Sequence, residues 1–346
     1  MEKCWPLELT KMLTNKYPDC WDTIEVFRES RKTGEIPWGD RCYVPIGGTQ
    51  AIVKEHGNEI FMIDLNSQNY KESITNATLM AAIAPWRRYK QIYTFKPELE
   101  YALREQAYDC EIPVEIFDSL PYPGIYIQTT TFEDEDGFFV HLEYDMNRNE
   151  YELRLTIIQN DGQINMPSVH LKENGTIMDG LNEYVRIIKL NNCGLVPEID
   201  TVDADMLYDD IAGRIQLVLY LCAQNKEVKP DPVQEKIVRT PKDPSMIKDK
   251  YREIKKYICG EEISKTLKVY RRKINTTGES KKSSGIYTPS CSIASSSKRP
   301  HMRRAHWHHY RTGVGRANLI LKWLPPMMIH EGEMVGANSV QVNEIE

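Results

Sequence analysis

The sequence predicts an α+β protein in which helices pack against an antiparallel β-sheet. In roughly the first 110 residues, apolar side chains recur three and four positions apart, which is typical of amphipathic helices. Residues 124–171 change to the alternating, β-branched pattern of strands. Helical spacing returns over residues 177–225, and a last strand pattern lies at Leu319–Leu324.

The N-terminal region is predicted to be mainly helical. The spacing of apolar residues favours helices over residues 6–13, 20–27, 74–89 and 98–108, and Pro97 suits a first helical turn. Glycine and proline between residues 34 and 48 indicate a loop. Residues 51–65 fit either a strand or a helix.

The middle of the chain is predicted to form a four-strand antiparallel meander. Its strands are expected over residues 124–129, 138–144, 150–158 and 164–171. Asp161-Gly162 is a strong hairpin turn before the last of them. Helices are then expected over residues 177–190 and 203–225, and the second has the widest apolar stripe in the chain.

The rest of the chain gives weaker signals. Residues 248–259 are predicted to be a short helix or a loop, and residues 264–274 a strand. Residues 275–297 are rich in Ser, Thr, Gly and Lys, which favours a flexible loop. We therefore expect four parts: a helical region (1–112), a sheet-plus-helices core (113–274), this loop (275–297), and a basic segment whose strand returns to the core (298–330). The strand is expected to join the sheet, either completing or bordering it.

Composition favours a soluble protein of the cytoplasm. The 346 residues include 41% hydrophobic and 27% charged side chains, as in ordinary globular proteins. The eight cysteines form no C-x-x-C pair, and no leader segment is recognised, so a reducing compartment is expected. No apolar stretch is long enough for a bilayer, and no membrane partner is predicted.

One segment, Lys298–Tyr310, concentrates unusual side chains. It holds four histidines, four Lys or Arg residues and two aromatic residues, with no acid. Charge is uneven elsewhere too: residues 98–152 contain fifteen acids and two bases, and residues 280–330 contain nine bases and no acid. This asymmetry favours internal pairing of an acidic sheet with a basic segment. The alternative is a basic surface for nucleic acid or an acidic peptide.

Several chemistries fit this segment. RNA contact would use Arg303, Arg304, Arg311 and Arg316 on phosphates, with Trp307 and Tyr310 as stacking platforms. A metal-independent ribonuclease would use His306 and His308 as acid and base. A metal site is disfavoured because the segment has no Cys, Asp or Glu ligand, so no metal or cofactor is predicted. The plainest alternative is structural hydrogen bonding. Trp86-Arg87 fits a contact patch or, more simply, a core tryptophan beside a surface arginine.

The same segment carries a family resemblance. The pattern K-R-P-H-x-R-R-x-H-W-H-x-Y at residues 298–310, T-G-x-G at 312–315 and the tryptophan strand with prolines at 323–326 resemble the second-described type V-A anti-CRISPR inhibitors, the AcrVA-two family. Weaker matches lie at Ala84–Arg87, Pro113–Ile127, Leu219–Cys222, Tyr257–Gly260 and Arg271-Arg272.

The resemblance implies an inhibitor of the type V-A CRISPR effector nuclease, carried by phages or plasmids and active in a bacterial cytoplasm. Such an inhibitor would recognise the nascent N-terminal peptide of the effector during translation and lower its mRNA. The implied partners are that peptide and possible contacts with ribosome and mRNA, and the implied protein is an interaction protein rather than an enzyme. The expected binding residues are Arg299, His301, Arg303, Arg304, His306, Trp307, His308, Tyr310, Arg311, Arg316, Trp86 and Arg87.

Overall fold

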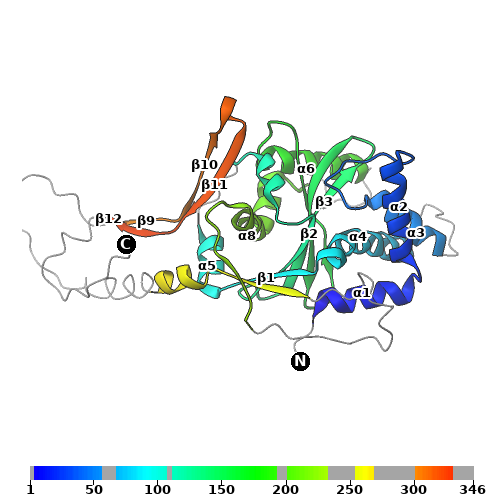
Figure 1. The fold of residues 1–346 in the computed structure, drawn as a ribbon, viewed down its shortest axis with the longest axis horizontal. Helices are drawn as coiled ribbons and strands as arrows, with labels where there is room; N and C mark the ends of the chain where they lie inside the picture. Colours follow the sequence, from blue (N-terminus) through cyan, green and yellow to red (C-terminus); the bar gives the residue numbers. More distant parts are fainter. Residues whose placement is uncertain are drawn as a thin grey trace, which may run out of the picture.

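A central mixed β-sheet separates two helical layers, and a two-stranded arm projects from one side (Figure 1). The computed structural model describes residues 4–56, 68–106, 111–192, 201–232, 254–268 and 301–329. In the described residues, helices and strands come in separate runs along the chain, without a repeated βαβ pattern. The predicted α+β class is confirmed. The predicted loop at 275–297 lies outside the described residues.

The first layer contains the predicted N-terminal helices. Their bounds are α1 (Trp5–Lys16), α2 (Cys20–Thr33), α3 (Ile46–His56) and α4 (Gln68–Tyr89). Helix α3 resolves the ambiguity at residues 51–56 in favour of helix. Leu13, Ile24, Ile52 and Met80 are buried in this layer, which packs on the sheet at Phe139.

The sheet has eight strands. They are β1 (Gln91–Phe95), β2 (Gly124–Gln128), β3 (Glu135–Asp145), β4 (Glu150–Gln159), β5 (Ile164–Asn165), β6 (Ser168–His170), β7 (Val228–Pro230) and β8 (Lys255–Cys259). The order is β5-β4-β3-β2-β1-β8-β7, with β6 also paired to β4. The antiparallel meander predicted for β2 to β4 is confirmed.

Three local predictions need correction. Strand β8 occupies residues predicted as a short helix or loop, and it joins β1 in parallel. Residues 264–268, predicted as strand, are helical, and the rest of that stretch lies outside the described residues. The single arm expected over 164–171 is split into β5 and β6 around Pro167, which has no N–H for a ladder bond.

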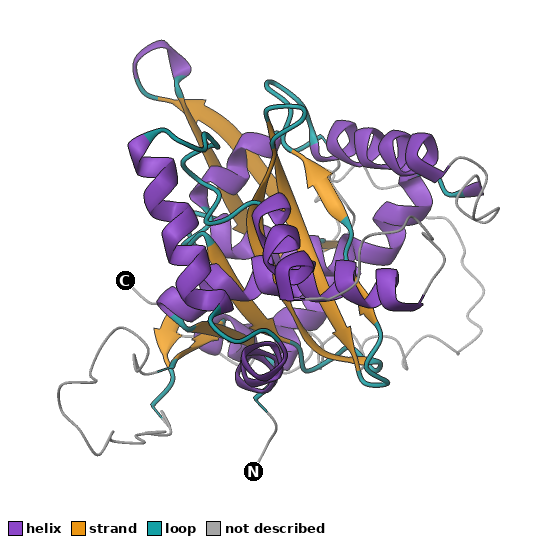
Figure 2. Ribbon diagram, turned by 90° about the vertical axis from the view of Figure 1, so that its right-hand side faces the viewer, coloured by secondary structure: helices purple, strands orange, loops and turns teal. Residues whose placement is uncertain are grey.

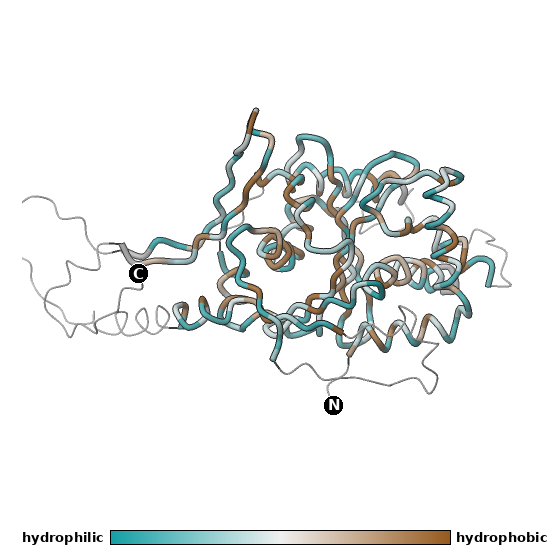
Figure 3. The backbone as a smooth tube through the Cα atoms, viewed as in Figure 1, coloured by the Kyte–Doolittle hydropathy of each residue, from teal (hydrophilic) through white to brown (hydrophobic). Residues whose placement is uncertain are grey.

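The second layer covers the opposite face of the sheet, on the side of the central strands away from the N-terminal helices in Figure 1. Figure 2 looks at the sheet from the side of the N-terminal helices. It is built from α5 (Pro97–Glu105), the short 3₁₀ helix η1 (Val114–Ser119), α6 (Ile177–Asn192) and α8 (Ala204–Cys222). Helix α8 is buried over almost its whole C-terminal half, as its apolar stripe predicts. The hydrophobic parts of the chain gather along α8 and the central strands in Figure 3.

The C-terminal arm, residues 301–329, is a bent two-stranded ribbon outside the main sheet. Its strands are β9 (His301–Arg303), β10 (His306–Thr312), β11 (Asn318–Leu324) and β12 (Met327–Ile329). The strand predicted at Leu319–Leu324 exists, but its predicted place in the main sheet is wrong, because β11 pairs with β10. The short link between β10 and β11 contains Gly313 and Gly315, both with positive φ, so the chain reverses direction there at a small cost in loop-closure entropy.

Two tryptophans and two glutamines fasten the arm to the second layer. Trp307 and Trp323 are opposite each other in the ribbon and both are buried. The Trp323 indole donates to Gln106 Oε1 over 2.7 Å, and the Trp307 indole donates to Gln216 Oε1. Gln106 Nε2 donates to the same Gln216 oxygen. Gln216 on α8 is therefore the shared acceptor of two buried donors.

Backbone bonds add to this attachment. The Gln224 amide donates to Leu321 O over 2.9 Å, just beyond the end of α8. The Asn225 side chain donates to Trp323 O and accepts from Trp323 N, at 2.8 and 3.0 Å. The Trp323 ring also packs edge-on against Tyr220, with centroids 6.0 Å apart. The turn that directly follows α8 is thus joined to the arm by hydrogen bonds.

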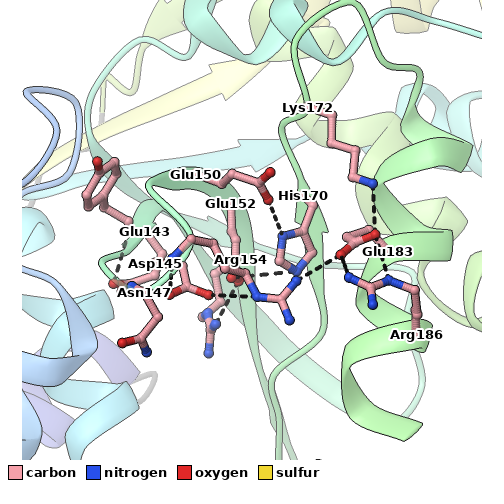
Figure 4. Close-up of polar contacts among 12 residues, drawn as sticks. Glu143, Asp145, Asn147, Glu150, Glu152, Arg154, His170, Lys172, Glu183 and Arg186 are labelled. Carbon is pink, nitrogen blue, oxygen red and sulfur yellow. Dashed lines mark hydrogen bonds and ion pairs between the residues drawn. The ribbon is translucent and has the colours of Figure 1, made fainter. Parts of the chain in front are cut away.

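One end of the sheet is polar inside. The registers of β3, β4 and β6 place Glu143, Glu152 and His170 in one row across the sheet. Figure 4 shows His170 between the carboxylates of Glu150 and Glu152, at 3.8 and 3.6 Å. Nearby, Glu183 of α6 accepts from Arg148 and Lys172, each at 2.8 Å, and from Arg186. These contacts fix α6 to the edge of the sheet.

Charge states at this end follow from burial and pairing. Burial lowers the pKa of the His170 imidazole, although Glu152, Glu150 and Glu183 act in the opposite direction. Bonds from Arg186 and Lys172 lower the pKa of the Glu183 carboxyl. Both shifts make the folded state bind fewer protons than the unfolded chain as the pH falls.

Replacement of Gln216 by Leu tests the anchor. The change keeps the side-chain volume but leaves the Trp307 and Gln106 donors without their acceptor, so we expect a loss of about 2 kcal/mol or more in the free energy of unfolding. Urea titration measures it. Gln224→Ala is the matched control, because that exposed side chain lies beside the same contact and should change stability by less than about 0.5 kcal/mol. Equal losses in the two variants would contradict the shared-acceptor role.

His170 gives a pH test. Because its folded pKa lies below the ordinary 6.5, its contribution to stability is complete above pH 6.5 and is lost as the pH falls toward the folded value. The free energy of unfolding of the natural protein should therefore fall relative to His170→Gln between pH 8 and pH 5, a range that brackets this titration. Asp179→Asn is the control, since bonds from Thr176 lower the pKa of the Asp179 carboxyl below its ordinary 3.8, and the stability difference of this variant should stay constant in that range. Parallel curves for the natural protein and His170→Gln would refute the assignment.

Candidate functional site

The arm has an inner and an outer face. Alternation along β10 and β11, with Trp307 buried against Gln216, places the side chains of 307, 309, 311, 319, 321 and 323 on the inner face. The outer face carries the alternate residues, His306, His308, Tyr310, Thr312, Asn318, Ile320, Lys322 and Leu324. His306 and His308 therefore share the outer face.

The inner face serves attachment. The sequence predicted that Trp307 could stack on an RNA base. The side chain is only 5% exposed, so its ring is not available for such stacking. Arg311 reaches Glu115 of η1 over 2.7 Å. Within the described residues, this is the ion pair that joins the basic segment to the acidic stretch at 98–152. Internal pairing therefore accounts for Arg311 and not for the other basic residues of the arm.

The acids of that stretch have other partners. Glu135 pairs with Arg214 of α8 over 2.6 Å. Glu100 is fully buried and accepts from the backbone and hydroxyl groups of Thr130 and Thr131 at 2.6–3.1 Å. Asp118 pairs with Arg41 of the N-terminal layer. The arm is consequently left with unneutralised positive charge.

The outer face and the bend carry that charge beside flat rings. Arg303, Arg304 and Arg316 are exposed, and none of them forms an ion pair with a described residue. The His308 and Tyr310 rings lie 5.3 Å apart at a tilt of 33°. Lys322 Nζ lies 5.6 Å from the centre of the Tyr310 ring on the neighbouring strand. Arg299 lies outside the described residues, as does the His301 side chain.

His306 is held at both ring nitrogens. Its Nδ1 lies 3.1 Å from the Arg304 carbonyl oxygen, and its Nε2 lies 2.9 Å from Arg303 Nη2. Because a carbonyl can only accept, Nδ1 carries the proton, and Nε2 accepts from the guanidinium. A lone pair already bonded to arginine is a poor general base. Across the parts of the chain that the structure describes, no group of three or more His, Cys, Asp or Glu is placed to hold a metal ion.

A second candidate surface is a cavity of about 550 Å³ between α1, α2 and the end of α4, here called the α1–α2–α4 pocket. It has aromatic walls and charged groups of both signs. Its lining residues are Leu7, Thr10, Trp21, Asp22, Glu25, Tyr43, Ala84, Trp86, Arg87, Arg88 and Lys90. The pocket lining includes Trp86 and Arg87, which the sequence predicted as binding residues. Helices α1, α2 and α4, which form the pocket, lie across the central strands from the arm in Figure 1.

Trp86 and Arg87 have different roles in this pocket. Trp86 is fully buried, donates to Gln91 O over 2.9 Å and packs edge-on against Phe139. It forms the floor and belongs to the core. The Arg87 guanidinium lies 4.3 Å from the centre of the Trp21 ring, and within the described residues it forms no ion pair. Burial lowers the pKa of Arg87, so an anionic ligand group in the pocket would restore the lost solvation.

Sequence reasoning missed Trp21, Tyr43 and the glutamines Gln106 and Gln216. Trp21 looked like an ordinary apolar position on α2, and Tyr43 lies in a loop, so neither showed a local signal for a pocket. Gln216 interrupts the apolar stripe of α8, and a polar residue at such a position requires a buried partner. The polar Gln216 in this apolar stripe could therefore have indicated a buried hydrogen bond, although the sequence does not identify the bonding partner.

The comparisons with known proteins agree with the motif in the arm. A family model described as AcrVA2-like, the anti-CRISPR type V subtype A2 family, matches residues 93–331. A crystal structure of AcrVA2 is similar in fold, with a TM-score of 0.58 and 16% identity, over 95% of this chain and 100% of that chain. No curated protein matches the chain in sequence.

No helix in the described parts of the chain is long and apolar enough to cross a bilayer.

The crystal structure supports the fold over both helical layers and the sheet, at an identity too low to carry more. The family model supports more, because it spans well over half of the residues and includes the whole described arm. The chain belongs to the AcrVA2-like, anti-CRISPR type V subtype A2 family.

Proposed function

We propose that this protein inhibits a type V-A CRISPR effector by recognising the effector's nascent N-terminal peptide and lowering its mRNA. The observation that carries the proposal is membership of the anti-CRISPR type V subtype A2 family over residues 93–331. An inhibitor of this class must act on some component of the type V-A system. Recognition of the peptide during translation is the finer part of the proposal.

The α1–α2–α4 pocket is the proposed peptide site. Its volume of about 550 Å³ is within the range of pockets that enclose several side chains or a small ligand. Asp22 offers a carboxylate, and Arg87 offers a guanidinium without an ion pair among the described residues. The Glu25 carboxylate already accepts from Arg28 and Tyr43. A peptide presents both charges and apolar side chains, so it matches a lining that is aromatic and doubly charged.

The position of the pocket is compatible with this role. It is built from residues 7–90, ahead of the segment that the family model matches, while the similar crystal structure covers 95% of the chain. The region that the family model matches and the proposed peptide site would then be different parts of one molecule. A change in the N-terminal layer could alter the recognised peptide without disturbing the arm.

A reporter experiment tests peptide recognition in cells. The N-terminal coding segment of a type V-A effector is fused to a reporter, and mRNA and protein are measured with and without the inhibitor. We expect both to fall. The control inserts one nucleotide at the start of the segment and deletes one at its end, which changes the peptide but leaves the RNA almost intact. Equal repression of the frameshifted reporter would overturn recognition of the peptide.

A binding experiment tests the site. Arg87→Ala should weaken binding of a synthetic peptide of the effector's N-terminal residues by about tenfold or more, as expected for loss of a charged contact in a desolvated pocket. Isothermal titration calorimetry measures the affinity. Lys71→Ala is the control, because Lys71 is exposed on α4 outside the pocket. Asp209→Asn changes a smaller cavity near α5 and α8. Loss of peptide binding in Asp209→Asn but not in Arg87→Ala would refute the assigned site.

A further inference from the structure

The outer face of the C-terminal arm is a surface that peptide recognition does not use. It combines exposed cations with flat rings, on a ribbon whose inner face is fixed to α8. The sequence from residue 301 to residue 329 contains no acid. Among the described residues of the arm only Arg311 is paired with a carboxylate, so the exposed Arg303, Arg304 and Arg316 carry charge that no described acid neutralises. A fixed, uniformly basic face is suited to a polyanion.

We propose that this face binds single-stranded RNA without cleaving it. Arg303 and Arg304 at the bend and Arg316 at the tip would contact phosphates, and Lys322 lies between them on β11. The His308 and Tyr310 rings, 5.3 Å apart along the strand and tilted by 33°, supply a flat surface on which a base can stack. The proposal is independent of the peptide site.

Ring stacking distinguishes RNA from the other polyanion that fits the charge, an acidic peptide. An acidic peptide gains from the cations but has no flat base to place on the Tyr310 ring. The Tyr310 and Thr312 hydroxyls lie on the same face as this platform, where they can bond a 2′-hydroxyl, a group that DNA lacks. Charge, stacking surface and hydroxyl donors together therefore favour RNA.

The geometry of His306 argues against cleavage. Its Nε2 accepts from Arg303 and its Nδ1 donates to the Arg304 carbonyl, so neither nitrogen is free to take a proton from a ribose hydroxyl. His308 alone would leave the reaction without the second member of an acid–base pair. His306 instead orients the Arg303 guanidinium at the bend of the arm.

The test measures fluorescence anisotropy of a labelled single-stranded RNA of about 12 nucleotides with the full-length protein. Tyr310→Ala should weaken binding by about tenfold or more, while Tyr310→Phe keeps the ring and most of the affinity. Arg304→Glu should weaken binding and reduce the slope of log affinity against log salt by about 0.7 or more. Lys71→Glu makes the same charge change on α4 and should have little effect. Melting curves show whether each variant remains folded.

Three results would overturn the proposal. The first is RNA affinity that is unchanged by Tyr310→Ala and Arg304→Glu in folded protein. The second is equal or tighter binding of a DNA strand of the same sequence or of an oligoglutamate peptide at the same face. The third is fragmentation of the RNA on a gel that disappears in His308→Ala, which would instead support a ribonuclease. None of these depends on the reporter experiment, so failure of one proposal leaves the other intact.

Discussion

The attachment of the arm depends on one buried amide. Gln216 lies in the middle of the most apolar helix, where an unbonded side-chain oxygen would be costly. Its oxygen accepts from Trp307 and from Gln106, and Gln106 in turn accepts from Trp323. This chain of three bonds fixes which face of the ribbon is turned inward. The basic, ring-bearing outer face is a consequence of that choice.

The sheet lies between the two proposed binding sites. The α1–α2–α4 pocket lies in the helical layer on one face, and the arm is fastened to helix α8 on the other. In Figure 1 the N-terminal helices and the arm lie at opposite sides of the central strands. One molecule could thus hold a peptide and an RNA at the same time without competition between the two ligands. The rigid core between them would set the distance.

The parts of the fold that the sequence predicted are those with strong local patterns. The meander of β2, β3 and β4 and helix α8 have long runs of one periodicity, and all of them are present. Strand β8 was missed because five residues carry too little pattern to distinguish a strand from a helix. The pairing of β11 was misassigned because strand propensity does not specify a partner. The partner strand, β10, is adjacent in the chain, and only the attachment of the finished ribbon depends on Gln216, about a hundred residues away.

The candidate site shows the same limit. The arm was found from composition alone, since four histidines and four bases in thirteen residues need no structure to be noticed. The division into inner and outer faces required the register of Trp307 with Trp323. The pocket joins side chains from three helices and a loop, so Trp21 and Tyr43 gave no signal in a linear reading. Arg87 was recognised only as a member of a W-R pair.

The bond between Gln106 and Trp323 spans 217 positions of the chain. During synthesis the N-terminal parts emerge first, and a chain grows by about 5–20 residues each second. Helix α8 would leave the ribosome with Gln216 and Tyr220 still uncovered, several seconds before the arm arrives to bury them. Assembly of this core is therefore delayed by topology, as expected when contacts are distant in sequence. A protein with such a late closure depends on its newly made chain staying free of aggregation during that interval.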